Sequence, residues 1–237
     1  GAFDEFMRHS ITKMSSLHFA AHEDYSKRIM RLGEDPKTIF TVGGLGAENI
    51  ALMKSSLFSR KECEEILNVK FSKKNLFVTF HPETNKKNSL QDLKKLLTAL
   101  SNLENVSLFI SMPNADTNFN EFSEEIKRFV INKPDCRWAF YSLGHQVYFS
   151  LLQFVDAVVG NSSSGLLEAP SFNIATINIG DRQKGRVKGK SVIDVEPCQN
   201  LIHTTLEELF EGKFKEIIDT TVNPFYKNGT AEEIARI

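Results

Sequence analysis

A turn rich in small and hydroxylated residues carries the clearest chemical signal in the sequence. Residues 160–165 read Gly-Asn-Ser-Ser-Ser-Gly after an apolar segment, and Glu168 follows three residues later. The first amides of a helix have no intrahelical partner, so small residues there would let a diphosphate approach them closely. A carboxylate one turn later could accept hydrogen bonds from two adjacent ribose hydroxyls. A serine cap on an ordinary helix is the structural alternative. The candidate diphosphate contacts are Ser162, Ser163, Ser164 and Gly165.

Two other segments supply side chains that suit phosphate. His81 precedes Pro82 at the end of an apolar run, where it could contact phosphate, relay a proton or simply occupy a turn. Arg182 and Arg186 lie in a loop punctuated by glycines. Guanidinium groups bind phosphate in a bidentate manner, although runs of charge are often only solvated.

A parallel sheet would bring these segments together. Short apolar strands are predicted at residues 76–80, 106–110, 137–142, 156–160, 174–179 and 192–195. Helical patterns separate them, most strongly at residues 90–103 and 118–132, and a short helix is predicted at 166–171. Buried strands alternating with helices are typical of the α/β class with a Rossmann-like parallel sheet. Ligands bind at the carboxyl ends of such strands, where the candidates above are placed.

The charged stretch at residues 59–74 is the predicted connection between two units. Residues 1–58 are expected to hold the final elements of one α/β unit and its crossover. Their helices and strands are predicted at residues 5–17, 18–21, 23–32, 38–42 and 49–57, with a backbone turn at 43–46. Residues 75–222 form a complete second unit and residues 223–237 a helical tail. The chain starts without Met and ends within a helical pattern, so both ends are expected to be cuts.

Composition excludes several classes of function. The formal net charge is −1, which gives no electrostatic footprint for nucleic acid or an anionic membrane. Three widely spaced cysteines argue against a disulfide framework or a zinc site and favour a reducing, cytoplasmic location. No apolar run reaches the ~20 residues that span a bilayer. His18 and His22 lack an evident third ligand, so no metal site is expected.

Six separated stretches agree, in order and spacing, with one known family. They are residues 1–13, 40–46, 80–84, 160–168, 178–186 and 223–226. Together they resemble the UDP-N-acetylglucosamine 2-epimerase family over essentially the whole chain. Residues 81–84, His-Pro-Glu-Thr, and the Arg8-His9 pair resemble the hydrolysing branch, which feeds sialic and nonulosonic acid synthesis. The resemblance implies the two-domain GT-B architecture, with the N-terminal domain largely missing from this chain.

The resemblance also implies an activity and a set of roles. UDP would leave a UDP-N-acetylhexosamine by elimination, and water would then add to give free N-acetylmannosamine or a 2,4-diacetamido analogue. No cofactor is implied, and the 237 residues alone are expected to bind UDP but to be inactive. Ser162 and Ser163 would hold the diphosphate, with Glu168 on the ribose. The implied catalytic residues are Asp4, Glu5 and His81, and the implied further UDP contacts are Arg8, Arg182 and Arg186.

Two other functions remain open at this stage. A glycosyltransferase of the same architecture would also need a diphosphate site and a carboxylate on ribose, but it has no particular reason to keep the front motif Asp4-Glu5…Arg8-His9. A non-catalytic UDP-binding or regulatory module is the second alternative. The sequence leaves the oligomeric state open, with a homo-oligomer as one option.

Overall fold

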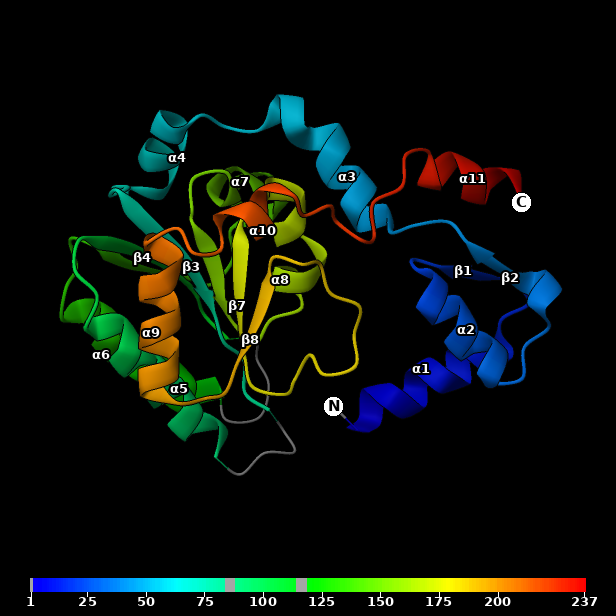
Figure 1. Ribbon diagram of the computed structural model, residues 1–237, viewed down its shortest axis with the longest axis horizontal. Coiled ribbons are helices and arrows are strands. Elements are labelled where there is room, and N and C mark those ends of the chain that lie inside the picture. Colours follow the sequence, from blue (N-terminus) through cyan, green and yellow to red (C-terminus); the bar gives the residue numbers. More distant parts are fainter. Residues whose placement is uncertain (1, 84–87, 114–118) are drawn as a thin grey trace.

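A computed structural model of the chain describes residues 2–83, 88–113 and 119–237 (Figure 1). These residues form two parallel sheets, one of two strands and one of six. The predicted α/β class with a parallel sheet is therefore confirmed. Residues 84 and 118, which belong to a predicted motif and a predicted helix, lie outside the described residues.

The N-terminal unit is built around the smaller sheet. Its elements are α1 (Ala2–Met14), β1 (His18–Ala20), α2 (Glu23–Arg31), the 3₁₀ helix η1 (Pro36–Thr38) and β2 (Ile39–Thr41). Strands β1 and β2 pair in parallel, and α2 connects them. All four elements predicted in this stretch are present, with bounds within about three residues of the expected ones.

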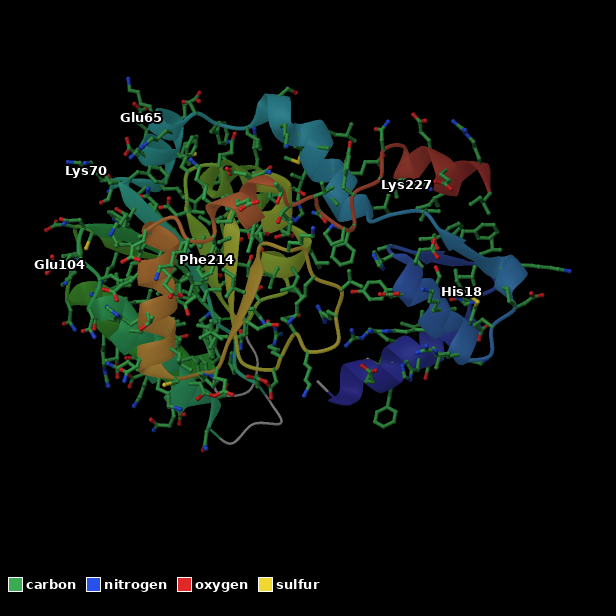
Figure 2. The ribbon with its side chains drawn as sticks, viewed as in Figure 1. His18, Glu65, Lys70, Glu104, Phe214 and Lys227 are labelled. Carbon is green, nitrogen blue, oxygen red and sulfur yellow. The ribbon has the colours of Figure 1, made fainter. Side chains whose placement is uncertain are left out.

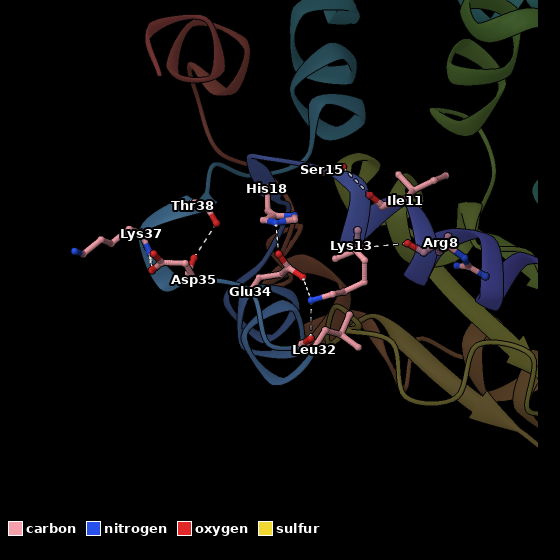
Figure 3. Close-up of polar contacts among 11 residues, drawn as sticks. Arg8, Ile11, Lys13, Ser15, His18, Leu32, Glu34, Asp35, Lys37 and Thr38 are labelled. Atoms are coloured by element: carbon pink, nitrogen blue, oxygen red, sulfur yellow. Dashed lines mark hydrogen bonds and ion pairs between the residues drawn. The ribbon is translucent and has the colours of Figure 1, made fainter.

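A polar cluster holds α1 against this small sheet. Figure 3 shows the Glu34 carboxylate between Lys13 at the end of α1 and His18 at the start of β1. Lys13 Nζ lies 2.5 Å from Glu34 Oε1, and His18 Nε2 lies 3.3 Å from Oε2. The hydrogen bond from Lys13 is the main cause that lowers the pKa of Glu34. His18 is therefore engaged in a structural contact within the N-terminal unit.

A helical connection leads to the second unit. It consists of α3 (Leu45–Met53), η2 (Lys54–Ser56) and α4 (Arg60–Leu67). Helix α3 begins four residues earlier than predicted, because Gly44 serves as its N-cap and Gly46 lies inside the helix instead of in a turn. Gly43 does make the expected turn, with φ of +91°. A capping box between Ser59 and Glu62 starts α4.

The six-stranded sheet has the order β5-β4-β3-β6-β7-β8, and every pair is parallel. Its strands are β3 (Lys74–Thr79), β4 (Val106–Ser111), β5 (Arg137–Phe140), β6 (Ala157–Gly160), β7 (Ala175–Ile179) and β8 (Val192–Val195). The chain first builds outward from β3 to β5 and then returns to place β6 on the other side of β3. The junction of β3 and β6 is thus the topological switch point, where open α/β sheets bind their ligands.

Helices cover both faces of this sheet, as Figure 1 shows. On one face, α5 (Ser89–Ser101), α6 (Phe119–Ile131) and α9 (Gln199–Phe210) pack on a core that includes Leu76 and Val78. On the other face, α7 (Gly144–Leu152), α4 and α3 pack on a core that includes Phe77. Alternate residues of β3 thus face opposite layers, the pattern of a strand buried on both sides.

The end of the chain returns to the N-terminal unit. Two short helices, α8 (Ser164–Leu167) and η3 (Ala169–Phe172), lie between β6 and β7, and α10 (Lys215–Asp219) follows α9. After α10 the backbone crosses to α11 (Thr230–Arg236), which packs on α3. Lys227, labelled in Figure 2 beside this crossing, donates from Nζ to the Thr41 carbonyl at 3.4 Å. The Glu48 carboxylate on α3 accepts the amides of Thr230 and Ala231 at 2.8 and 2.9 Å. The predicted domain boundaries remain a prediction.

Candidate functional site

Two loops that are far apart in sequence meet at the switch point. His81 follows β3, and the serine-rich turn follows β6, in which Gly160 pairs with Thr79. Gly160 has φ of +140°, and a Cβ there would lie 2.0 Å from the Thr79 carbonyl oxygen. Only glycine allows this close approach of the two backbones. The first residue of the Gly-Asn-Ser-Ser-Ser-Gly motif is therefore needed to bring the two loops together.

Asn161 connects the two loops. Its fully buried side-chain amide accepts from the His81 backbone N–H at 2.8 Å and donates to the His81 backbone carbonyl at 2.9 Å. The backbone carbonyl of Asn161 accepts from Gln183 Nε2 at 2.7 Å and from Arg182 at 3.1 Å. The ends of β3, β6 and β7 are thereby linked. Asn161 and Gln183 were not singled out in the sequence, although a polar residue directly after a buried strand is a usable signal.

One cavity of about 330 Å³ opens where these loops meet. Four of the predicted site residues line it, namely His81, Ser162, Ser164 and Glu168. The rest of the lining comes from β3, the ends of β4 and β5, and α7: Phe77, Thr79, Ser111, Phe140, Ser142, Leu143, Gly144, His145 and Tyr148. The structure thus brings together His81 and the serine turn and adds residues of α7, none of which was among the predicted site residues.

Glu168 is the central charged group of this cavity. Ser164 Oγ donates to Glu168 Oε2 at 2.5 Å, and the Tyr148 hydroxyl contacts Ser164 Oγ. Burial raises the pKa of Glu168, and the bonds from Ser164 and Tyr148 and the nearby His145 partly oppose that rise. Burial, reinforced by the charge of Glu168, also raises the pKa of Tyr148 well above its usual value. The carboxylate is therefore a constrained acceptor in a partly desolvated position.

The serine turn begins a short helix. Ser163 is the N-cap of α8, which ends at Leu167, so Glu168 lies one turn beyond the cap, between α8 and η3. Ser162 Oγ accepts from the Ser164 amide at 3.4 Å. The amides of the first turn can meet an anion, although a helix of one turn contributes little dipole. Gly165 has a packing function, because a Cβ there would lie 2.5 Å from Thr176 Cγ2 on β7.

The two predicted arginines of the loop after β7 are separated. Arg182 reaches the switch point through its bond to Asn161. Arg186 instead lines a second cavity, of about 470 Å³, together with Lys184 and Lys188. This part of the loop contacts the N-terminal unit, where Arg28 donates to the Gly185 carbonyl. Arg186 therefore does not line the cavity that contains Glu168.

Glu5 and Arg8 of α1 also do not line that cavity. Glu5 is exposed and pairs with Arg8 at 3.8 Å and with His9 at 3.4 Å, one turn along the same helix. The side chain of Asp4 lies outside the part of the chain that the structure describes. Their assignment to the sugar site stays a prediction.

The residues that the structure describes contain neither a metal-binding cluster nor a membrane-spanning helix. Among the described residues, no group of three or more His, Cys, Asp or Glu side chains is arranged to hold a metal ion. His22 caps α2 by accepting from the Asp24 amide. No helix in the described ranges combines the length and apolar character needed to cross a bilayer.

Known proteins share both the sequence and the fold. A family model described as UDP-N-acetylglucosamine 2-epimerase matches residues 1–237. "Polysialic acid biosynthesis protein P7" of Escherichia coli is 39% identical over 237 residues, which cover 99% of this chain and 59% of that protein. "GDP/UDP-N,N'-diacetylbacillosamine 2-epimerase (hydrolyzing)" of Campylobacter jejuni is 40% identical over 217 residues, covering 91% of this chain and 56% of that protein.

A solved structure of UDP-GlcNAc 2-epimerase from Neisseria meningitidis, bound to UDP-GlcNAc, superposes with a TM-score of 0.76 at 14% identity. The match covers 95% of this chain and 62% of that one, and at this identity it shows the shared GT-B-type fold. The chain thus spans less than two thirds of the length of each of these relatives.

Proposed function

Because the chain belongs to the UDP-N-acetylglucosamine 2-epimerase family, we propose that the protein carrying it is a hydrolysing 2-epimerase of a UDP-activated N-acetylhexosamine. The observation that carries the proposal is the cavity at the switch point, lined by His81, the serine turn and the buried carboxylate of Glu168. The name of the Campylobacter jejuni relative supports the hydrolysing branch and an amino-sugar substrate, and the name of the Escherichia coli relative supports a role in sialic acid synthesis.

The proposed reaction has two steps. A base removes the proton from C2 while the C1–O bond to UDP breaks, which gives a glycal and UDP. Water then adds across the double bond, with the hydroxyl on C1 and a proton on the opposite face of C2. The products are UDP and a free sugar with inverted configuration at C2. The enzyme must stabilise charge on the departing diphosphate and supply a base and an acid.

The residues at the switch point suit the nucleotide half of this reaction. The serine turn offers hydroxyls from Ser162 and Ser163 and the first amides of α8 to the diphosphate. Glu168 offers a carboxylate acceptor to the ribose hydroxyls. His81 and Arg182 lie beside the turn, where they can support departure of the diphosphate. Proton transfer at C2 is assigned to Asp4 or Glu5, with Arg8 and Arg186 as outer UDP contacts.

The substrate sugar is N-acetylglucosamine or a 2,4-diacetamido relative. The Campylobacter jejuni relative, at 40% identity, is named for diacetylbacillosamine, and this favours testing both. A cytoplasmic location is part of the proposal. The odd number and wide spacing of the three cysteines support it.

Product analysis tests this function directly. The protein, at the length its gene encodes, is incubated in D₂O with each UDP sugar and no acceptor. We expect equal amounts of UDP and of a free 2-epimer carrying deuterium at C2. Phosphorus NMR measures the UDP, and proton NMR measures the free sugar and its deuterium. UDP release only after an acceptor is added would instead identify a glycosyltransferase. UDP binding without turnover of either sugar would indicate a non-catalytic module.

A further inference from the structure

We propose that Tyr148 is a positioning residue, whose hydroxyl acts together with that of Ser164 to fix the Glu168 carboxylate in the cavity wall. The three side chains form a continuous chain of contacts, from the Tyr148 hydroxyl to Ser164 Oγ and from Ser164 Oγ to Glu168 Oε2. The inference rests on the proposed function, because it assigns the fixed carboxylate to the ribose diol of a nucleotide.

Counting protons shows what the two hydroxyls contribute. An ionised carboxylate is an acceptor only, and a serine hydroxyl carries a single proton. The Tyr148 hydroxyl likewise carries a single proton and contacts both Ser164 Oγ and the Glu168 carboxylate. Ser164 and Tyr148 together therefore supply two protons to the network that holds the carboxylate. A phenylalanine would keep the ring but remove one of these two donors.

Helix α7 holds the tyrosine in place. The Tyr148 ring packs against Phe77 of β3 and Phe149, with ring centroids 5.1 and 5.6 Å apart. The following residues of α7 through Leu152 are buried in the core of that face, and Ser150 Oγ accepts from the Phe58 amide at 2.9 Å. The hydroxyl is thus presented by a packed helix, which is the condition for orienting another side chain with little entropy loss.

This network has two consequences for the carboxylate. With Oε2 engaged by Ser164, rotation of Glu168 is restricted, so less entropy is lost when a diol binds. Hydrogen bonds to the ionised form also favour ionisation. Among the residues that the structure describes, the other titratable groups that line this cavity are His81 and His145, and Arg182 approaches it through Asn161. None of these is altered when only the tyrosine hydroxyl is removed.

Calorimetric titration with UDP tests the proposal on the protein at the length its gene encodes. Three proteins are compared from about pH 5 to about pH 8: the unaltered chain, Tyr148→Phe and Tyr226→Phe. Tyr226 lines a different cavity, so its variant controls for loss of a phenol hydroxyl. For Tyr148→Phe we expect roughly tenfold weaker binding at neutral pH, the loss of one hydrogen bond in a charged network. The pH below which binding is lost should also move upward.

Each outcome has a stated meaning. Unchanged affinity and unchanged pH profile in Tyr148→Phe would overturn the positioning role while leaving the proposed function intact. A uniform loss of affinity without displacement of the pH profile would also overturn it, because the ring would then act by packing alone. If Tyr148→Phe does not fold, Ser164→Ala removes the other donor and should displace the profile in the same direction. Failure of the unaltered chain to bind UDP at any pH would instead refute the proposed function.

Discussion

Replacing Gly165 with alanine tests whether the sheet beneath the serine turn sets its position. A Cβ at residue 165 would lie 2.5 Å from Thr176 Cγ2 and 3.2 Å from Thr176 Oγ1. Thr176 is buried on β7, and its hydroxyl donates to the Gly165 carbonyl at 2.6 Å. Carbon atoms in proteins normally approach to about 3.5–4.0 Å, so the added methyl overlaps by roughly 1 Å. Either the turn or the strand must move.

The structure allows the cost to be bounded. Overpacking of this kind costs about 1–3 kcal/mol of unfolding free energy. A helical alanine regains up to about 1 kcal/mol of backbone propensity, so the net loss should be about 1–2 kcal/mol. Gly46→Ala is the matched control, because a Cβ there, inside α3, meets no atom within 4 Å. That variant should gain about 0.5–1 kcal/mol.

A second substitution separates steric overlap from other causes. Thr176→Ser removes the Cγ2 methyl that the new Cβ would meet and keeps the hydroxyl that bonds the Gly165 carbonyl. Alone it should cost about 1 kcal/mol, for one buried methyl. The double variant with Gly165→Ala should lose less free energy of unfolding than the two single variants lose together, by about 1–2 kcal/mol.

Urea unfolding of the four variant chains measures these differences, and UDP titration measures the effect on the site. Displacement of the turn in Gly165→Ala should weaken UDP binding about tenfold, or about 1.4 kcal/mol. The reasoning is refuted if Gly165→Ala is as stable as Gly46→Ala. It is also refuted if Thr176→Ser adds its full cost to Gly165→Ala, since the two positions would then not interact.

Three further substitutions test the site and its frame. Glu168→Gln should raise the melting temperature at neutral pH, because the raised pKa of Glu168 makes ionisation costly in the folded state but not in the unfolded state. In thermal melts the difference from the unaltered chain should shrink towards about pH 4, where the carboxyl is protonated in both states. The same variant should lose UDP binding. Asn161→Ala should cost about 2–4 kcal/mol in urea unfolding, because the buried N–H and C=O of His81 lose their partners. Glu48→Ala should accelerate hydrogen exchange in α11 and leave that of β3 unchanged, because the carboxylate holds the first amides of α11.

Local pattern determined the elements and the core faces. The helical pattern at residues 90–103 places four leucines on one face, and all four are buried: Leu93, Leu96, Leu97 and Leu100. The corresponding face of α6 buries Phe122, Ile126 and Phe129 and half-buries Val130. The strands between residues 74 and 195 lie within a few residues of their predicted bounds. Periodicity and strand composition act over a few residues, so one sequence contains them. The serine turn and His81 were also found locally, because their residue types follow apolar strands.

Strand order was decided by the tertiary structure. A set of parallel strands predicts that loops meet at one edge, but not that β6 returns beside β3. That placement brings His81 to Asn161, eighty positions later in the chain. It also brings α7 over the turn, and with it Tyr148. Contacts of this kind depend on long-range packing, which leaves no periodic trace in the sequence.

The same distinction explains where the candidate site differed from expectation. Arg182 and Arg186 are four residues apart in one glycine-punctuated loop, yet they line different regions because the loop turns towards α2. Gly165 is predicted to admit a diphosphate, and the structure adds that its missing side chain makes room for Thr176. Residue type alone indicated that these positions were special. Only the three-dimensional neighbours, fixed by packing against the sheet, showed the physical reason.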